Sequence, residues 1–275
     1  MTKSKNKAPS DAGTTGNKSI QAYAGSILKD LHTLPDKVVI NSILVEGDVS
    51  VGARFHMGDK GAPTILFFHG NGEIVADYND MGPVYNRIGV NFLPVDYRGY
   101  GRSTGRPTIT AMMRDCHIIF DFTKNWLREK GCHGPFIIMG RSLGSASALE
   151  LASHYRDRID GLIVESGFAF SGPLLQLLGV DLRAIGFEEE AGLGNIEKIR
   201  RVDKPTLIIH AELDHIIPFS DGQALFDASP AQDKTLLKIA GANHNDILMR
   251  GLSDYMAAIG ALIRKVTPET GIRGL

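Results

Sequence analysis

The chain has 275 residues, 43% of them hydrophobic, and its 30 basic residues against 31 acidic ones give a net charge of −1. This near-neutral balance gives no sign of a nucleic-acid partner or of attraction to an anionic membrane. Two cysteines, Cys116 and Cys132, are too few for a disulfide framework. We therefore expect reduced thiols and a cytoplasmic location.

The N-terminal residues 1–19 are polar and lack the apolar core of a signal peptide, so they predict a disordered tail. A short amphipathic helix is expected over 20–34. No apolar stretch has the length that a membrane span needs, and none is predicted. Motifs are spread along the remainder and must converge, which favours a single domain over 20–275 rather than two.

Strand and helix patterns alternate along this domain. Two strands flank the turn Gly47-Asp48 and predict an antiparallel start to a sheet. Later strands are then expected at 64–69, 91–96, 135–140, 161–165, 206–209 and 235–239, with helices near 75–88, 109–130 and 143–155. Such alternation is typical of the α/β class, with a mostly parallel sheet and helices on both faces.

The most informative stretch is residues 140–144, Gly-Arg-Ser-Leu-Gly. It follows an apolar strand and precedes a helix rich in small residues, which is the context of a nucleophile elbow. Its glycines suit a turn so sharp that side chains there would collide with the neighbouring strand and helix. We interpret Ser142 as a nucleophile, whereas the alternative is an incidental helix-capping serine.

An elbow serine needs a general base and an acid that orients the base, in the chain order serine, acid, histidine. Asp214 follows the strand 206–209, and His244 follows the next strand and a glycine turn. Both therefore fall at the carboxyl edge of the sheet, where α/β proteins keep their chemistry. Other acids compete with Asp214 for the orienting role, namely Glu212, Glu165 and Asp246.

An oxyanion hole is expected beside the serine, because attack on an ester carbonyl creates a negative oxygen that fixed donors must meet. We predict the backbone N–H groups of Leu143 and Asn71 as those donors, with His69 shaping the loop around Asn71. His210 and His215 flank the acid and could suggest a metal site with Asp246, but they lack a metal-ligand spacing, so no metal is predicted. An acyl-enzyme mechanism implies no cofactor.

Together these motifs resemble the serine-dependent branch of the α/β-hydrolases, which includes small esterases, thioesterases and serine-peptidase-like members. The resemblance covers roughly residues 38–264 and is carried by His69–Gly72, 96–103, 140–144, Asp214 and His244. It implies an eight-stranded sheet, the triad roles of Ser142, Asp214 and His244, and a cap inserted at about 167–203. Relatives that open halides or epoxides place aspartate at the elbow, which Ser142 argues against.

The short cap insert has an apolar first half. One interpretation is a small lid whose side chains give an acyl group an apolar wall, and the other is an ordinary helix packed on the sheet. We expect the acyl side of the substrate pocket to be lined by Phe168, Phe170, Leu174 and Leu178. Glu73 is expected to face the same pocket.

These inferences predict a serine hydrolase that acts on a small-molecule ester or thioester through an acyl-enzyme. An aminopeptidase-like amidase is an alternative, and it would need Glu73 or Glu165 to bind a peptide amino group. A non-catalytic protein of the same fold is another, although such proteins usually lose a triad residue and none is missing here. The natural substrate, acyl length and oligomeric state stay open.

Overall fold

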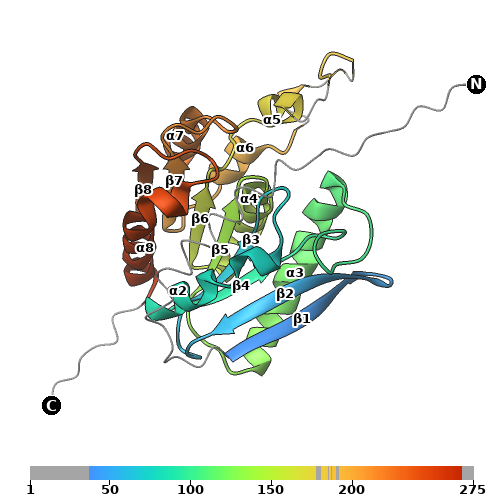
Figure 1. Ribbon diagram of the computed structural model, residues 1–275, viewed down its shortest axis with the longest axis vertical. Coiled ribbons are helices and arrows are strands. Elements are labelled where there is room, and N and C mark those ends of the chain that lie inside the picture. The colour runs from blue at the N-terminus through green and yellow to red at the C-terminus, as the bar shows by residue number, and fades with distance from the viewer. Residues whose placement is uncertain (1–36, 178–180, 185, 187, 190–191, 268–275) are drawn as a thin grey trace, which may run out of the picture.

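The computed structural model describes residues 37–177, 181–184, 186, 188–189 and 192–267 (Figure 1). Eight strands form one sheet in the order β1-β2-β4-β3-β5-β6-β7-β8. β2 pairs antiparallel with both β1 and β4, and every later pair is parallel. This confirms the mostly parallel eight-stranded sheet. The strands are β1 (Lys37–Glu46), β2 (Val49–Met57), β3 (Thr64–Phe68), β4 (Asn91–Val95), β5 (Phe136–Arg141), β6 (Gly161–Glu165), β7 (Thr206–Ala211) and β8 (Lys234–Ile239).

Helices cover both faces of the sheet (Figure 1), and each face has its own hydrophobic core. In β3, Leu66 and Phe68 join one core and Ile65 and Phe67 join the other, because successive side chains point to opposite faces. β3 is buried along its whole length, as is typical of a central parallel strand. The helices are α2 (Met81–Arg87), α3 (Ile109–Glu129), α4 (Gly144–His154), α5 (Ser171–Leu177), α6 (Asn195–Ile199), α7 (Phe219–Ala228) and α8 (Ile247–Val266).

The single helix expected near 75–88 is instead two elements, a 3-10 turn η1 (Val75–Tyr78) followed by α2. Pro83 is the physical reason. In the interior of one long helix it would remove a hydrogen bond and clash with the carbonyl of Asn79, whereas the first turn of a helix tolerates proline. The chain therefore restarts its helix at Met81. A second 3-10 turn, η2 (Arg156–Arg158), follows α4.

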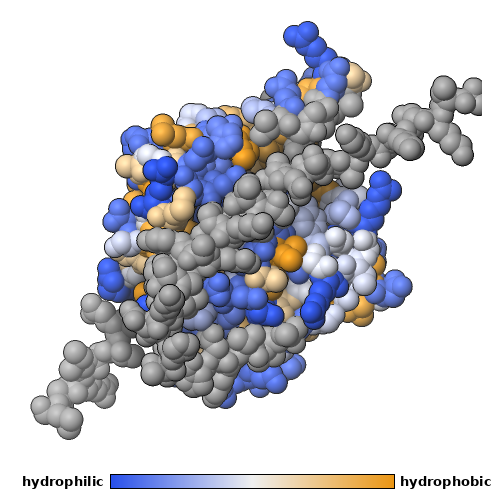
Figure 2. All heavy atoms as spheres, in the orientation of Figure 1, coloured by the Kyte–Doolittle hydropathy of each residue, from blue (hydrophilic) through white to orange (hydrophobic). Residues whose placement is uncertain are grey.

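The segment between β6 and β7 contains α5 and α6. α6 packs against α4 and α7, while α5 lies at the periphery of the molecule (Figure 1). The expected tail 1–19 and helix 20–34 lie outside the described residues. Within the described part of the chain, no helix is both long and apolar enough to cross a bilayer. The described surface on the face in Figure 2 mixes hydrophilic and hydrophobic residues.

Candidate active site

The turn between β5 and α4 presents Ser142 at the carboxyl edge of the sheet. Ser142 has a φ of +51°, a left-handed conformation that side-chain-bearing residues rarely adopt. A Cβ at Gly140 would lie 2.2 Å from the carbonyl oxygen of Gly144, and one at Gly144 would lie 2.1 Å from that of Phe68. Both positions therefore require glycine, and the close approach that they permit makes the sharp turn possible.

Ser142, His244 and Asp214 form one hydrogen-bonded chain. Nε2 of His244 lies 3.0 Å from Oγ of Ser142, and Nδ1 of His244 lies 2.7 Å from Oδ2 of Asp214. All three residues are buried, with 5–8% of their surface exposed. Asp214 follows β7 and His244 follows β8, so parallel strands bring side chains from distant parts of the sequence to one edge.

The surroundings of this chain of groups favour a neutral imidazole beside an ionised carboxylate. Burial lowers the pKa of His244 below its ordinary value of 6.5, although Asp214 opposes the shift. Burial would raise the pKa of Asp214, but His244 and two backbone amides hold it below 3.8. Those amides, from Ile216 and Ile217, donate to Oδ1 at 2.9 and 2.8 Å. The imidazole is therefore available to accept a proton at neutral pH.

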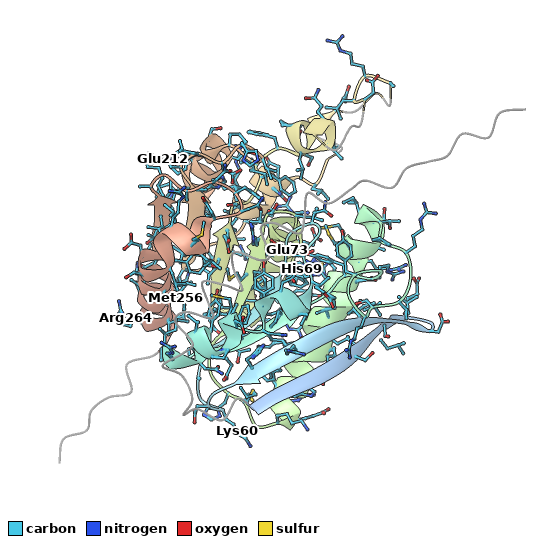
Figure 3. All side chains as sticks on the ribbon, viewed as in Figure 1. Lys60, His69, Glu73, Glu212, Met256 and Arg264 are labelled. Carbon is cyan, nitrogen blue, oxygen red and sulfur yellow. The ribbon has the colours of Figure 1, made fainter. Side chains whose placement is uncertain are left out.

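The competing acids have other partners. Glu212 lies at the edge of the molecule (Figure 3), where it accepts from the Gly241 amide at 2.8 Å and pairs with Lys238. Asp246 pairs with Arg250 and accepts from a backbone amide in its own turn. Glu165 accepts from the Tyr255 hydroxyl at 2.7 Å. Among the described residues, Asp214 is the only acid hydrogen-bonded to His244.

The loop after β3 is braced from several sides. Nδ1 of His69 lies 2.8 Å from the Gly70 carbonyl oxygen, and the buried His69 ring also contacts Asp96 at 3.2 Å. The side chain of Asn71 accepts from the Tyr100 hydroxyl at 2.7 Å. No described protein group accepts a hydrogen bond from the backbone amides of Asn71 and Leu143. Both amides are thus free to donate to a ligand.

Glu73 is held by protein groups of its own loop and of the elbow. Figure 3 shows it beside His69 in the middle of the molecule. Its carboxylate accepts from the Gly70 amide at 2.7 Å and the Tyr78 hydroxyl at 2.6 Å, and it pairs with Arg141 at 3.0 Å. A largely shielded carboxylate requires partners, and the buried Arg141 supplies one here. The expected contact of Glu73 with substrate stays a prediction.

The proposed acyl-side residues do not share one environment. Phe168 is 1% exposed and belongs to the hydrophobic core, which corrects its expected place on an open pocket wall. Its carbonyl accepts from the side chain of Asn195 at 2.8 Å, which fixes the backbone there. Phe170 is 44% exposed, and Leu174 is partly buried against the core. Leu178 lies outside the described residues.

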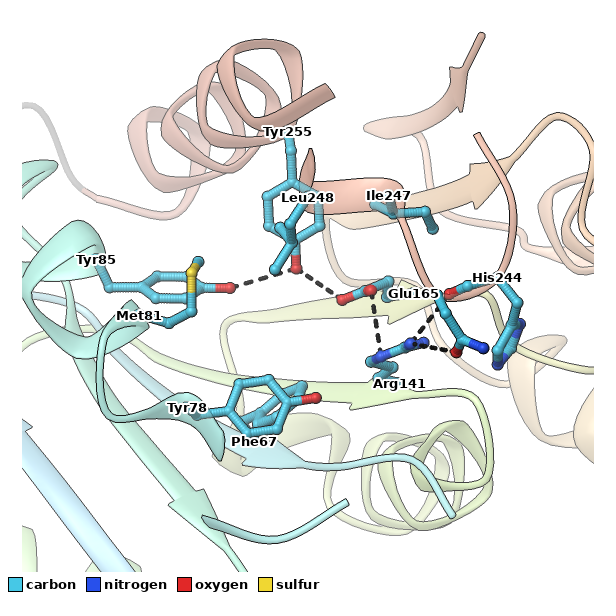
Figure 4. A pocket seen from close by; sticks show the side chains of 11 residues that line it. Phe67, Tyr78, Met81, Tyr85, Arg141, Glu165, His244, Ile247, Leu248 and Tyr255 are labelled. Atoms are coloured by element: carbon cyan, nitrogen blue, oxygen red, sulfur yellow. Dashed lines mark hydrogen bonds and ion pairs between the residues drawn. The ribbon is translucent and has the colours of Figure 1, made fainter. Parts of the chain in front are cut away.

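Arg141 is a site residue that the sequence did not reveal. It is buried, and its Nη2 donates to the carbonyl oxygen of His244 at 3.0 Å (Figure 4). Its Nε lies 3.0 Å from Oε1 of Glu73. Beside it lies a cavity of about 20 Å³ lined by Arg141, Glu165, Tyr255 and their neighbours. That volume suits about one water molecule and no acyl chain. Arg141 is the variable second position of the elbow motif, where no sequence pattern predicts these contacts.

The histidines near Asp214 are involved in local structure. Nε2 of His210 lies 2.9 Å from the Ile217 carbonyl oxygen, and Nδ1 of His215 is hydrogen-bonded to Asn243. The described residues contain no group of three or more His, Cys, Asp or Glu side chains arranged to hold a metal ion. The thiol of Cys116 is buried, and burial raises its pKa.

Solved structures share this architecture. An esterase from Pyrococcus furiosus matches with a TM-score of 0.68 at 16% identity, covering 86% of this chain and 95% of that one. Est1E from Butyrivibrio proteoclasticus, solved with ferulic acid, matches with a TM-score of 0.63 at 18% identity, covering 82% and 97%. Identities this low show the fold alone, and that fold is the α/β-hydrolase fold.

Sequence matches agree with the fold. A family model described as serine aminopeptidase, S33, matches residues 60–180. The human alpha/beta hydrolase domain-containing protein 17B is 32% identical over 200 residues, 68% of this chain and 62% of the relative. A lysophosphatidylserine lipase of Danio rerio is 32% identical over 192 residues, 63% of this chain and 49% of the relative. The chain belongs to the α/β-hydrolase superfamily, and it spans less than two thirds of the length of these relatives.

Proposed function

We propose that the protein is a serine hydrolase that cleaves carboxylic esters or thioesters through an acyl-enzyme on Ser142. The observation that carries the proposal is the continuous hydrogen-bonded chain from Ser142 Oγ through His244 to Asp214, at 3.0 and 2.7 Å. A hydroxyl, a neutral imidazole and an ionised carboxylate in this order are the groups that activate a serine for acyl transfer.

In the proposed reaction, Oγ of Ser142 attacks the substrate carbonyl as its proton passes to Nε2 of His244. The carbonyl oxygen becomes an oxyanion that accepts from the amides of Asn71 and Leu143. Collapse of this intermediate expels the alcohol or thiol, which takes the proton from His244. Water then attacks the acyl-enzyme by the same route, which releases the acid and restores Ser142. Asp214 holds the ring and stabilises the imidazolium in both halves.

Esters are favoured over peptides on two grounds. One ground is that a relative carries the name lysophosphatidylserine lipase. The family model described as serine aminopeptidase favours the alternative. However, a free peptide amino group would need an unpaired acid, and both candidates, Glu73 and Glu165, lie against Arg141 at 3.0 and 3.6 Å. A non-catalytic role has no such supporting observation.

The test is active-site labelling followed by a substrate panel. The wild-type protein should react with a fluorophosphonate, and Ser142→Ala should not, while retaining the circular dichroism of the wild type. Ser153→Ala is the matched control, because Ser153 lies on α4 and its hydroxyl donates to the Glu150 carbonyl away from the site. Nitrophenyl esters, thioesters and aminoacyl amides then separate the candidates. Turnover of amides alone would contradict an esterase, and labelling of Ser142→Ala would refute the nucleophile.

A further inference from the structure

A buried guanidinium lies next to the proposed nucleophile and contacts two loops of the site. Arg141 is the last residue of β5 and immediately precedes Ser142. Its Nη2 donates to the main-chain carbonyl oxygen of His244 at 3.0 Å, and its Nε lies 3.0 Å from Oε1 of Glu73. The guanidinium of Arg141 therefore connects the elbow with the loop after β3 and with the loop after β8. Figure 4 shows its contact with the His244 loop.

Glu73 transmits this contact to the proposed oxyanion hole. Its Oε2 accepts from the Gly70 amide at 2.7 Å, and its own amide donates to the Gly70 carbonyl at 3.3 Å. These two bonds close a tight turn that contains Asn71, whose amide is one of the two proposed oxyanion donors. The Tyr78 hydroxyl, at 2.6 Å, holds the same carboxylate from η1. The direction of the Asn71 amide thus depends on where Glu73 is held.

We propose that Arg141 and Glu73 are positioning residues, which together set the oxyanion-hole loop and the His244 loop in register with Ser142. This inference rests on the proposed function, and neither residue is assigned a contact with substrate. Burial alone would oppose the charge of Arg141, but Glu73 and Glu165 favour it, so the pair is ionised. A lysine ammonium at position 141 is a single point charge on a flexible stem, and it lacks the planar fork of donors that reaches both loops.

The pair also affects the charge of the base. The charged groups that face His244 are Asp214 from the loop after β7, Arg141 from β5 and Glu73 from the loop after β3. Arg141 opposes protonation of the imidazole, whereas Asp214 and Glu73 favour it. Neutralising Glu73 should therefore lower the pKa of His244, while a change that keeps the charge at position 141 should leave it in place. A packing role alone predicts no such difference.

The experiment measures the second-order rate of fluorophosphonate labelling against pH in the full chain, for the wild type, Glu73→Gln and Arg141→Lys. Tyr85→Phe is the matched control. Its hydroxyl lines the same cavity but is bonded to Met139 and Tyr255 and not to Arg141. We expect labelling to slow by roughly 10–100-fold in both site variants, as misplaced catalytic groups do. The acid limb should move to lower pH in Glu73→Gln only, and Tyr85→Phe should match the wild type.

The outcomes separate this inference from the proposed function. A wild-type protein that is not labelled would refute the serine hydrolase and this inference with it. A labelled wild type, with Glu73→Gln equal to it in rate and pH profile, would overturn the positioning role alone. Thermal melts identify a variant that fails to fold. If Glu73→Gln fails to fold, Arg141→Lys provides the test. Labelling of Arg141→Lys at the wild-type rate would also overturn the inference.

Discussion

Asp214 Oδ2 and His244 Nδ1 lie 2.7 Å apart, and Oδ1 of the same carboxylate accepts hydrogen bonds from the backbone amides of Ile216 and Ile217. The amides fix the carboxylate, so the carboxylate in turn fixes the ring. An imidazole held in this way carries its proton on Nδ1 and leaves Nε2 free to accept one from Ser142, which lies 3.0 Å away.

Asp214→Asn should reduce kcat by up to about 10⁴-fold, because an amide that turns its NH₂ toward Nδ1 favours the wrong tautomer and cannot stabilise the imidazolium. Steady-state kinetics with the best ester from the panel would measure the loss. Glu212→Gln is the control. It removes a carboxylate from the same turn as Asp214, but the partners of that carboxylate are Lys238 and the Gly241 amide and not His244. A mild Asp214→Asn together with a crippling Glu165→Gln would show that Glu165 is the acid.

The pH dependence of kcat/KM should report the base. Burial holds the pKa of His244 below 6.5 in the folded protein, so the imidazole remains neutral into mildly acidic solution. We expect kcat/KM to fall on the acid side with a midpoint below pH 6.5, since that ratio reports groups of the free enzyme. A midpoint above that value would contradict the burial and charge pattern around the ring.

Gly144→Ala should disrupt the elbow. Its Cβ would lie 2.1 Å from the Phe68 carbonyl oxygen, which is main chain and cannot turn away. We expect a loss of about 1–3 kcal/mol of stability or more, together with loss of labelling at Ser142. Gly260→Ala is the matched control in α8, where the nearest atom to an added Cβ is 3.6 Å away. That change should stabilise the protein by about 0.5–1 kcal/mol. Equal melting temperatures in the two variants would contradict this account.

His56 should make the protein less stable in acid. It is 1% exposed, and within the described residues neither ring nitrogen has a hydrogen-bond partner. Burial, assisted by Arg54, lowers its pKa from 6.5 to about 4, so protons bind the unfolded chain more readily than the folded one in that window. Its contribution to stability is complete above pH 6.5 and is lost as the pH falls toward 4.

Urea unfolding at several pH values would test this expectation. One proton taken up on unfolding gives a slope of about 1.4 kcal/mol per pH unit. His56→Leu should flatten the slope by up to that amount between pH 6.5 and pH 4. His133→Gln is the control, because His133 is exposed. An unchanged slope in His56→Leu would mean that His56 does not titrate differently on folding.

The sharp turn at the elbow and the parallel sheet could be predicted from the sequence. Glycines at 140 and 144 around Ser142 predict a sharp strand-to-helix turn, because only glycine lets backbones approach so closely. Asp214 and His244 each follow an apolar strand, and the parallel sheet those strands imply brings their ends to one edge. Each of these features depends on a short local pattern, an apolar strand followed by a turn, which recurs along the chain. That is why the fold and the proximity of Ser142, Asp214 and His244 could be predicted.

The tertiary structure alone decided which polar side chains pair inside the protein. In the sequence Glu73 and Arg141 are two ordinary charged residues, and solvent exposure is the usual fate of both types. They meet because β3 and β5 are neighbours in the sheet, and the buried Arg141 is tolerated because the carboxylates of Glu73 and Glu165 lie against it. Phe168 likewise belongs to a core that it shares with residues of α4, of α6 and of the sheet. Such pairings depend on distances across the fold, which no local pattern of residues encodes.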